Sequence, residues 1–547
     1  MKNNLDFLRS RFELLIFTIC LLIFSMLLYK DPFSQRTLIS NLEPYPDTIH
    51  YIVPARSLAS GDEFLVKREG RGFHPSVKPL YSLILIPGYI FNKDPRIFYF
   101  TNFILAMVSV SLFFLIIRKI TKNIWISGLI FLLYITNYFF YWFPTLAMAE
   151  NLILPLFLAA LWLVLDKASV KNSILTGLLS LGFYVTKSAA APLTASFLVI
   201  YGIKIFIDQK DLIGKMKLWT ALGFGFILIL IPTLLYDSYL GKDSILTHFF
   251  SFISSGSPIV SDRITETSSA WFSPSYINKN LPQYLNALIG EQMRFLWDFS
   301  PIVPKFAGMG ALLGLLISLF IKKLKFLSFS LIAVLFSSIF FIATFYTADA
   351  RYIYHAIPTL LIGFALFLLF LFKSFKDRNL KMVFYIILGA IFLIYIVTNG
   401  LRLKNQIMLN IKYAETPWSY ISVLKLNEYF TKDRIKDKKK PIVITPMPAY
   451  FIDFYSNGNY SLLPLSLDQE FRKREKIVWG PADYTDLLKL YSDKITEGFE
   501  VYVAIYGLGI EGYLHNDFNK IKDKFNLTLV YPGCYDLCNI YKVSLKE

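Results

Sequence analysis

Isolated charged residues stand out in this chain because the sequence around them is mostly apolar. Lys and Arg side chains can hold phosphate oxygens and stabilise the negative charge that develops on a leaving group. A carboxylate can take a proton from an attacking hydroxyl or amine. Both kinds of side chain occur here, at Asp47, Arg56, Lys78, Glu150, Lys187, Asp349 and Arg351. Their mixture predicts chemistry on a phosphate-bearing substrate, provided that the fold brings them together.

The composition is typical of a polytopic membrane protein. Of the 547 residues, 55% are hydrophobic and 17% are aromatic, and the mean hydropathy is +0.49. Apolar runs close to the roughly 20 residues that a membrane helix requires recur through residues 1–400. Most of the basic residues behind the net charge of +17 fall in short clusters between these runs. That placement indicates cytoplasmic loops and argues against a nucleic-acid partner.

Placing each basic cluster in the cytoplasm predicts about eleven transmembrane helices, with the N-terminus cytoplasmic and the C-terminus outside. We interpret the first apolar run as a retained helix, because no small-residue cleavage site follows it. Two long loops, 30–96 and 237–304, then lie outside the plasma membrane. Within the first, residues 79–91 are too few to span comfortably and predict a re-entrant or interfacial helix. The predicted spans are 14–29, 97–117, 124–142, 148–165, 173–187, 190–207, 218–236, 306–321, 326–346, 353–372 and 382–399.

This topology places all of the isolated charges at one depth, the outer membrane interface. For any one of them, a snorkelling side chain or a structural ion pair is an equal alternative. For the group, a shared site is favoured, because both signs of charge converge at a level where unpaired charges are costly. A phosphate carried on a lipid would reach this depth directly from the bilayer.

The composition changes at about residue 401. Short β-type runs such as "PIVITP" and "NLTLVYP" alternate with helical spacing at 415–430 and 511–524. Residues 401–547 therefore predict a small extracytoplasmic α/β domain. Cys534 and Cys538 are close enough to form a disulfide there, with two free thiols as the alternative. A metal site needs about four ligands, and no further Cys or His lies near this pair.

Several short motifs together resemble a known family. The first outside loop reads Asp47-Thr48-x-x-Tyr51-x-x-x-Ala55-Arg56-x-Leu58-x-x-Gly61-Asp62, followed by Lys78-Pro79-Leu80-Tyr81. It resembles the first outside loop of the GT-C glycosyltransferases, in the branch of the protein O-mannosyltransferases and the aminoarabinose transferases of lipid A. Further matches across residues 10–400 are Glu150 in "LAMAENLIL", Lys187 in "FYVTKSAAAPL" and Arg351-Tyr352 in "ADARYIYHAIP".

The resemblance implies transfer of a sugar from a polyprenyl phosphate to a protein, lipid or glycan acceptor on the outer face, with inversion at the anomeric carbon. By the same resemblance Asp47 is the catalytic or acceptor-orienting acid, and Glu150 is a second acidic position at the site. Lys78 maps onto a lysine near the donor phosphate. We expect the remaining cations to bind the donor phosphate and a set of neighbours to line the substrate: Arg56, Lys187 and Arg351 for the phosphate, and Thr48, Tyr51, Tyr81 and Tyr352 for the substrate.

Two departures from the family pattern matter. Thr48 stands where a second loop carboxylate is usual, and the lysine motif has one proline where two are common. Because hard cations require several carboxylate oxygens, we expect no divalent metal and no other cofactor. Two other functions remain as alternatives, a lipid-linked glycan flippase or transporter and a glycan polymerase or ligase. A transporter would place charges at mid-bilayer on broken helices, whereas these charges lie at one interface. The sugar, the acceptor and the oligomeric state stay open.

Overall fold

The structure is a computed structural model, and the chain divides into two compact units. Unit 1 comprises Met1–Asp31, Val77–Val260 and Ser269–Leu409, and unit 2 comprises Pro32–Ser76, Ser261–Ser268 and Asn410–Glu547. The structure describes residues 2–28, 46–64, 66–68, 71–73, 77–239, 273–295, 298–345, 347–375, 377–412, 425–431, 439–445, 459–465, 467, 486–504, 512–532 and 539–546.

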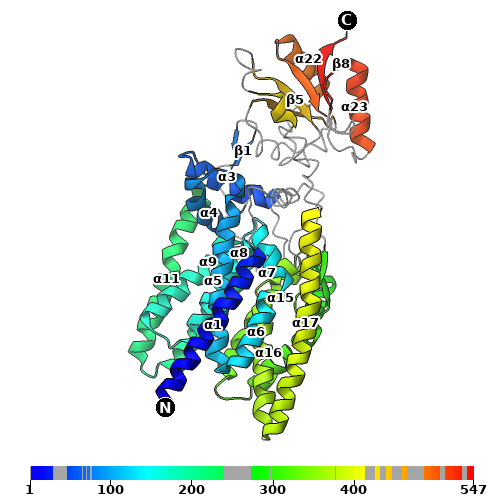
Figure 1. Ribbon diagram of the computed structural model, residues 1–547. Helices are drawn as coiled ribbons and strands as arrows, with labels where there is room; N and C mark the ends of the chain where they lie inside the picture. The colour runs from blue at the N-terminus through cyan, green and yellow to red at the C-terminus, as the bar shows by residue number, and fades with distance from the viewer. Residues whose placement is uncertain are drawn as a thin grey trace. The chain divides into compact units, whose positions relative to one another are not determined.

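Helices that run alongside one another make up most of unit 1 (Figure 1). Each of the predicted spans coincides with a helix or a bent pair of helices, because long apolar runs satisfy their backbone hydrogen bonds internally only as helices. The bounds are α1 (Lys2–Leu28), α5 (Phe98–Thr121), α6 (Ile124–Ile135), α7 (Tyr138–Trp142), α8 (Glu150–Leu165), α9 (Val170–Thr186), α10 (Ala191–Asp208), α11 (Leu212–Tyr239), α14 (Lys305–Ser318), α15 (Lys325–Ala343), α16 (Ala356–Ser374) and α17 (Arg378–Lys412).

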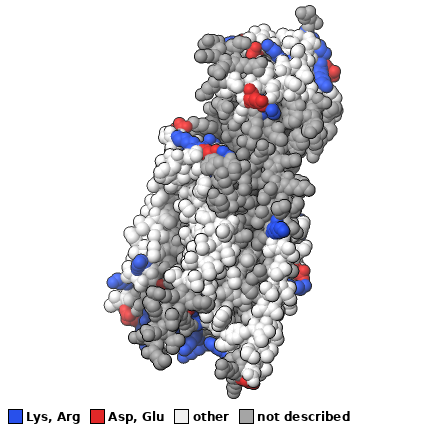
Figure 2. All heavy atoms as spheres, viewed as in Figure 1, with Lys and Arg blue, Asp and Glu red and all other residues white. Residues whose placement is uncertain are grey.

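Among the described residues, five helices are at least 18 residues long and apolar enough to cross a bilayer, and the bent pair α6–α7 would make a sixth. This is fewer than the eleven spans predicted from charge, because segments such as α8 and α14 fold as shorter apolar helices. Figure 2 shows a largely uncharged surface along unit 1, with Lys and Arg gathered near the end where the N-terminus lies. The chain is therefore an integral membrane protein.

Glycines set the closest helix crossings in unit 1. A Cβ on Gly177 of α9 would lie 2.2 Å from the carbonyl oxygen of Leu222 in α11, and one on Gly225 would lie 2.1 Å from that of Ile174. Only glycine permits this approach, and small residues commonly let membrane helices pack closely. The crossing holds α9 and α11 together, and charged residues of the candidate site lie on α11 and directly after α9.

The first predicted loop contains secondary structure that the sequence interpretation missed. Residues Pro46–Ala59 form helix α3, and two short antiparallel strands follow, β1 (Val66–Arg68) and β2 (Arg71–Phe73). These elements belong to unit 2. The predicted short helix at 79–91 is confirmed as α4 (Leu80–Phe91), which belongs to unit 1.

The second predicted loop is also partly ordered into secondary structure. Its described part begins with a 3-10 turn (Pro274–Tyr276) and helix α13 (Ile277–Leu288). A hairpin of β3 (Gln292–Phe295) and β4 (Asp298–Pro301) then leads into α14. The polar composition of this loop concealed α13, whose apolar residues lie on one face only.

The C-terminal part of unit 2 is a mixed sheet with strand order β6-β5-β7-β9-β8. β5 pairs in parallel with β6 and β7, whereas β9 pairs antiparallel with β7 and β8. The core of this sheet includes Ile444, Tyr491, Val503, Ile521 and Phe525. The predicted α/β domain is thereby confirmed. Its elements are β5 (Ile442–Thr445), β6 (Ser461–Pro464), α22 (Leu487–Thr496), β7 (Val501–Ala504), α23 (Gly512–Lys524), β8 (Phe525–Tyr531) and β9 (Ile540–Leu545).

Candidate active site at the end of helix α9

Helix α8 begins with Glu150, and buried amides hold the turn that precedes it. Asn102 of α5 and Asn151 of α8 both donate to the carbonyl oxygen of Leu146, each at 2.8 Å. The hydroxyl of Tyr81 in turn donates to the side-chain oxygen of Asn102 at 2.7 Å. Because these groups are buried and bonded to one another, the start of α8 is fixed. Tyr81, predicted to line the substrate, supports this turn.

The carboxylate of Glu150 forms an ion pair with Lys187, with 2.6 Å between Oε1 and Nζ. Glu150 is buried and lies in the first turn of α8, where the helix dipole favours a negative charge. Lys187 is the first residue after α9, in an extended conformation before a 3-10 turn (Ser188–Ala190). The pair therefore joins the end of one helix to the start of another.

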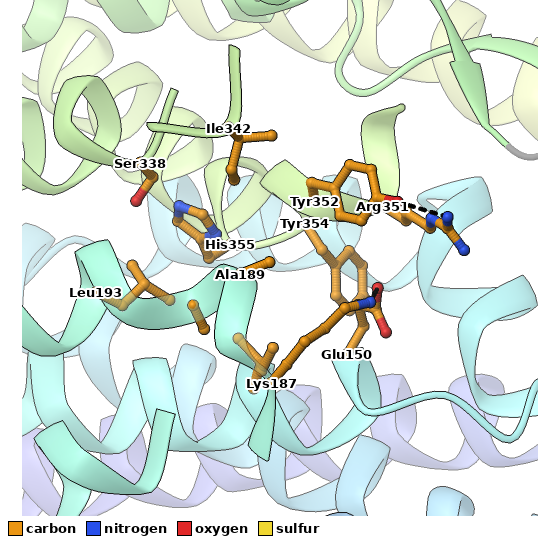
Figure 3. Close-up of a pocket in the computed structure, with 12 residues that line it drawn as sticks. Glu150, Lys187, Ala189, Leu193, Ser338, Ile342, Arg351, Tyr352, Tyr354 and His355 are labelled. Atoms are coloured by element: carbon orange, nitrogen blue, oxygen red, sulfur yellow. Dashed lines mark hydrogen bonds and ion pairs between the residues drawn. The ribbon is translucent and has the colours of Figure 1, made fainter. Parts of the chain in front are cut away.

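Arg351 and Tyr352 lie on a 3-10 turn (Ala350–Ile353) that faces this pair. The side chain of Asp349 caps the turn by accepting from the Arg351 backbone N–H at 2.9 Å. The Arg351 guanidinium donates to the Tyr352 hydroxyl at 2.6 Å, and the Lys187 Nζ lies 5.2 Å from the centroid of the Tyr352 ring. Figure 3 shows the Lys187 ammonium beside the Glu150 carboxylate, with Tyr352 above them and Arg351 at the right.

Helix α13 holds the segment that leads to Arg351. Asn280 donates to the carbonyl oxygen of Phe345 at 2.5 Å, and the Asp349 backbone N–H donates to the Tyr284 hydroxyl at 3.2 Å. Asn280 and Tyr284 are four residues apart, so they share one face of α13. Sequence reasoning missed both residues, although their spacing and polar character were readable.

Predicted residues from three separate segments meet around one small pocket with a cavity volume of about 20 Å³. Its charged residues lie at one side, and its other walls combine aromatic, small and apolar side chains (Figure 3). The lining residues are Glu150, Ile153, Lys187, Ala189, Ala190, Leu193, Ser338, Ile342, Arg351, Tyr352, Tyr354 and His355.

Lys78 pairs with a carboxylate that sequence reasoning did not select. Its Nζ lies 3.3 Å from both side-chain oxygens of Asp237, which is buried near the end of α11. The same Nζ lies 4.6 Å from the centroid of the Tyr184 ring. Burial lowers the pKa of Lys78, and Asp237 raises it partway back. An isolated acid near the C-terminal end of an apolar helix was the available signal for Asp237.

The two ion pairs are close in sequence along α9. Tyr184 contacts Lys78, and Lys187, three residues later, contacts Glu150. Tyr184 lies in the last turn of α9 and Lys187 directly follows that helix, so the end of α9 links the Lys78–Asp237 pair with the Lys187–Glu150 pair.

The remaining predicted residues belong to α3 of unit 2. Thr48 and Tyr51 are buried there, and Arg56 lies in the last turn of the helix. Asp47 is part of α3, but its side chain lies outside the described residues, as do Cys534 and Cys538. The approach of Asp47 to Lys78 and the predicted disulfide therefore stay predictions. Within the part of the chain that the structure describes, no three His, Cys, Asp or Glu side chains group as metal ligands.

Neither a protein-family model nor a curated protein matches this sequence. Several solved structures match its fold, and two of them are structures of ArnT. The crystal structure of ArnT from Cupriavidus metallidurans bound to undecaprenyl phosphate has a TM-score of 0.56 at 11% identity, and the match covers 97% of this chain and 98% of that one. The apo ArnT structure has a TM-score of 0.54 at 12% identity, covering 92% and 95%. The predicted GT-C fold is thereby confirmed over nearly the whole chain.

Proposed function

We propose that this protein is a membrane glycosyltransferase that moves a sugar from a polyprenyl-phosphate donor to an acceptor at the outer face of the membrane. The observation that carries this proposal is the pocket in which the Lys187–Glu150 pair, Arg351 and Tyr352 meet. The fold supports it, because the ArnT structure with the same fold was crystallised with undecaprenyl phosphate bound.

The reaction is a substitution at the anomeric carbon. The acceptor hydroxyl or amine attacks that carbon from the face opposite the phosphate, and the bond from the carbon to the phosphate oxygen breaks. The configuration inverts, polyprenyl phosphate leaves, and the acceptor proton passes to a carboxylate. Lys187, Arg351 and Lys78 stabilise the leaving phosphate by charge-assisted hydrogen bonds. Because these cations neutralise the phosphate, activity should survive treatment with EDTA.

The acidic roles follow from the family resemblance together with the local geometry. Asp47 is assigned as the base or acceptor-orienting acid, and Arg56 on the same helix as a further phosphate ligand. Glu150 holds Lys187 in place through a 2.6 Å contact and presents its second oxygen to the pocket. Thr48 and Tyr51 are assigned to the substrate side of α3.

We assign the site to the outer face of the plasma membrane and the N-terminus to the cytoplasm. The supporting observation is the gathering of Lys and Arg near the N-terminal end of unit 1 (Figure 2), because cytoplasmic loops are enriched in basic residues. Labelling of a cysteine introduced at Asn457 in intact cells tests this orientation. Protection of that cysteine from the reagent would contradict it.

The function is tested with purified protein and a panel of labelled polyprenyl-phosphate monosaccharides. We expect release of polyprenyl phosphate together with sugar transfer or slow hydrolysis. Asp47→Asn should lower the rate by about 10²–10⁴-fold, as expected for a positioned acid or base, with the melting temperature unchanged. A lower melting temperature with normal turnover would instead make Asp47 a structural partner within its loop. Translocation without bond cleavage would indicate a flippase, and extension of a lipid-linked oligosaccharide would indicate a polymerase.

A further inference from the structure

Helix α13 and the residues just before it form hydrogen bonds with the end of α15. Carbonyl groups at the end of a helix need partners from outside that helix. The side-chain amide of Asn280 donates to the carbonyl oxygens of Ala343 and Phe345, at 3.3 and 2.5 Å. The backbone N–H of Ser273 donates to the carbonyl oxygen of Thr344 at 2.7 Å. Three consecutive carbonyl groups at the end of α15 are therefore held by the segment that contains α13.

A second contact from α13 reaches the turn that carries Arg351. The Tyr284 hydroxyl accepts from the backbone N–H of Asp349 at 3.2 Å and donates to the carbonyl oxygen of the same residue at 3.5 Å. Tyr284 is fully buried, and burial raises its pKa, so the hydroxyl stays protonated and can both donate and accept. Because the side chain of Asp349 caps the turn at the Arg351 N–H, Tyr284 holds the start of that turn.

The contact at Asn280 leads to the same turn by a separate route. The ring of Phe345, whose carbonyl oxygen Asn280 holds, lies edge-on to the Tyr352 ring, with 5.0 Å between the two centroids. The Tyr352 hydroxyl in turn accepts from the Arg351 guanidinium. Asn280 and Tyr284 share one face of α13, so two routes from that face converge on Arg351 and Tyr352.

The position of the Arg351 guanidinium matters for phosphate binding, because charge-assisted hydrogen bonds from Arg require a defined geometry. Arg351 lies on a short 3-10 turn and not within a longer helix, so contacts from outside the turn help to determine where its side chain lies. No described residue of α13 lines the pocket. The helix can therefore influence the site only through the residues that it holds.

We propose that Tyr284 is a positioning residue, which holds Arg351 where it binds the phosphate of the donor, and that Asn280 is a second positioning residue of the same turn. This inference rests on the proposed function, in which Arg351 is a ligand of the donor phosphate. It gives the polar segment before β3 a part in donor binding, although that segment contributes no described side chain to the pocket.

The test combines Tyr284→Phe, which removes only a hydroxyl, with Arg351→Gln in a double-mutant cycle. Two quantities are measured on the purified full chain: the dissociation constant of undecaprenyl phosphate, and the KM for the polyprenyl-phosphate sugar that the wild type uses. Tyr284→Phe alone should raise both about two- to tenfold, the effect of one lost hydrogen bond. In the Arg351→Gln background it should raise neither, because the guanidinium that Tyr284 positions is gone. Lys78 and Lys187 remain there, so binding stays measurable.

Tyr89→Phe is the matched control. Tyr89 of α4 is as buried as Tyr284, and its hydroxyl donates to the carbonyl oxygen of Pro95 at 2.8 Å. The variant therefore also removes a buried hydrogen bond to the backbone, but neither Tyr89 nor Pro95 lines the pocket. We expect its dissociation constant for undecaprenyl phosphate to equal that of the wild type. An equal rise in Tyr89→Phe and Tyr284→Phe would overturn the inference.

The melting temperature of each variant separates positioning from stability alone. A lower melting temperature of Tyr284→Phe with an unchanged dissociation constant would overturn the inference, and so would a full effect of Tyr284→Phe in the Arg351→Gln background. If the wild type binds undecaprenyl phosphate but transfers no sugar, the proposed function fails, while the dissociation constants still decide the role of Tyr284. If the wild type does not bind undecaprenyl phosphate, both are refuted.

Discussion

The two ends of helix α8 each place a carboxylate against a lysine, but in different surroundings. At the first end, the side chain of Glu150 is 3% exposed and pairs with Lys187. At the other end, the side chain of Asp166 is 36% exposed and pairs with Lys119, which is 32% exposed. Glu150 lies at a helix N-terminus, where the dipole favours it, whereas Asp166 follows the C-terminus, where the dipole opposes it.

The comparison shows that the burial of an ion pair and its place on the helix determine how strongly its two charges depend on each other. Water screens the Lys119–Asp166 pair, so it contributes about 0–1 kcal/mol to stability. The Lys187–Glu150 pair is shielded, and each partner depends on the other because a lone buried charge is costly. In the described part of the chain, Glu150 also has a second oxygen without a partner. The N-terminal end of α8 is therefore suited to bind a ligand, and the C-terminal end to anchor the helix.

The largest expected effect comes from neutralising the buried carboxylate. Glu150→Gln should lower sugar transfer by about 10²-fold or more, because an amide neither balances the charge of Lys187 nor serves in proton transfer. The turnover number with a saturating polyprenyl-phosphate sugar is the measurement. Asp166→Asn, at the opposite end of α8, is the control and should keep full activity. Equal losses in both variants would remove the distinction between the two ends.

The next effect concerns stability. Lys187→Met should lower the free energy of unfolding by about 3–5 kcal/mol, because it leaves the Glu150 carboxylate buried without its cation. Lys119→Met should lower it by at most about 1 kcal/mol, since its pair is partly exposed and reached by water. Denaturation of both variants in the same detergent compares them. A double variant, Glu150→Gln with Lys187→Met, should recover part of the loss, whereas no recovery would show that the two charges are not coupled.

The smallest expected effect concerns Lys78 and Asp237, a pair between the two extremes. Burial lowers the pKa of Lys78 and Asp237 raises it, so Asp237→Asn should lower that pKa further. Lys78 would then lose its proton, and its attraction for phosphate, at a lower pH than in the wild type. In Asp237→Asn, the KM for the donor should therefore begin to rise at a lower pH than in the wild type. At a pH where Lys78 is neutral in the variant but still charged in the wild type, the KM of the variant should be about tenfold higher. Superimposable pH profiles would contradict this role.

Much of the architecture was predictable from local patterns. Apolar runs predicted the helices, and β-type runs such as "PIVITP" predicted strands that the structure places at β5. Lys187 and Glu150 were predictable as site residues because each is an isolated charge at the end of an apolar segment. Helix α3 was missed, although Thr48, Tyr51, Ile52 and Ala55 follow the helical i, i+3, i+4, i+7 spacing and are all buried. His50 and Pro54, which lie between them, concealed that pattern.

The sequence by itself determined which charged residues need a partner or a ligand, because a charge beside apolar helices is costly until it is paired or bound. Only the tertiary structure decided the partners. Lys78 meets Asp237 across 159 positions, and Glu150 meets Lys187 across 37. The physical reason lies in the helix crossings: Gly177 and Gly225 let α9 and α11 approach closely, and buried amides fix the start of α8. Each charged side chain pairs with the nearest opposite charge. Which charge is nearest depends on the packing of helices that are distant in sequence.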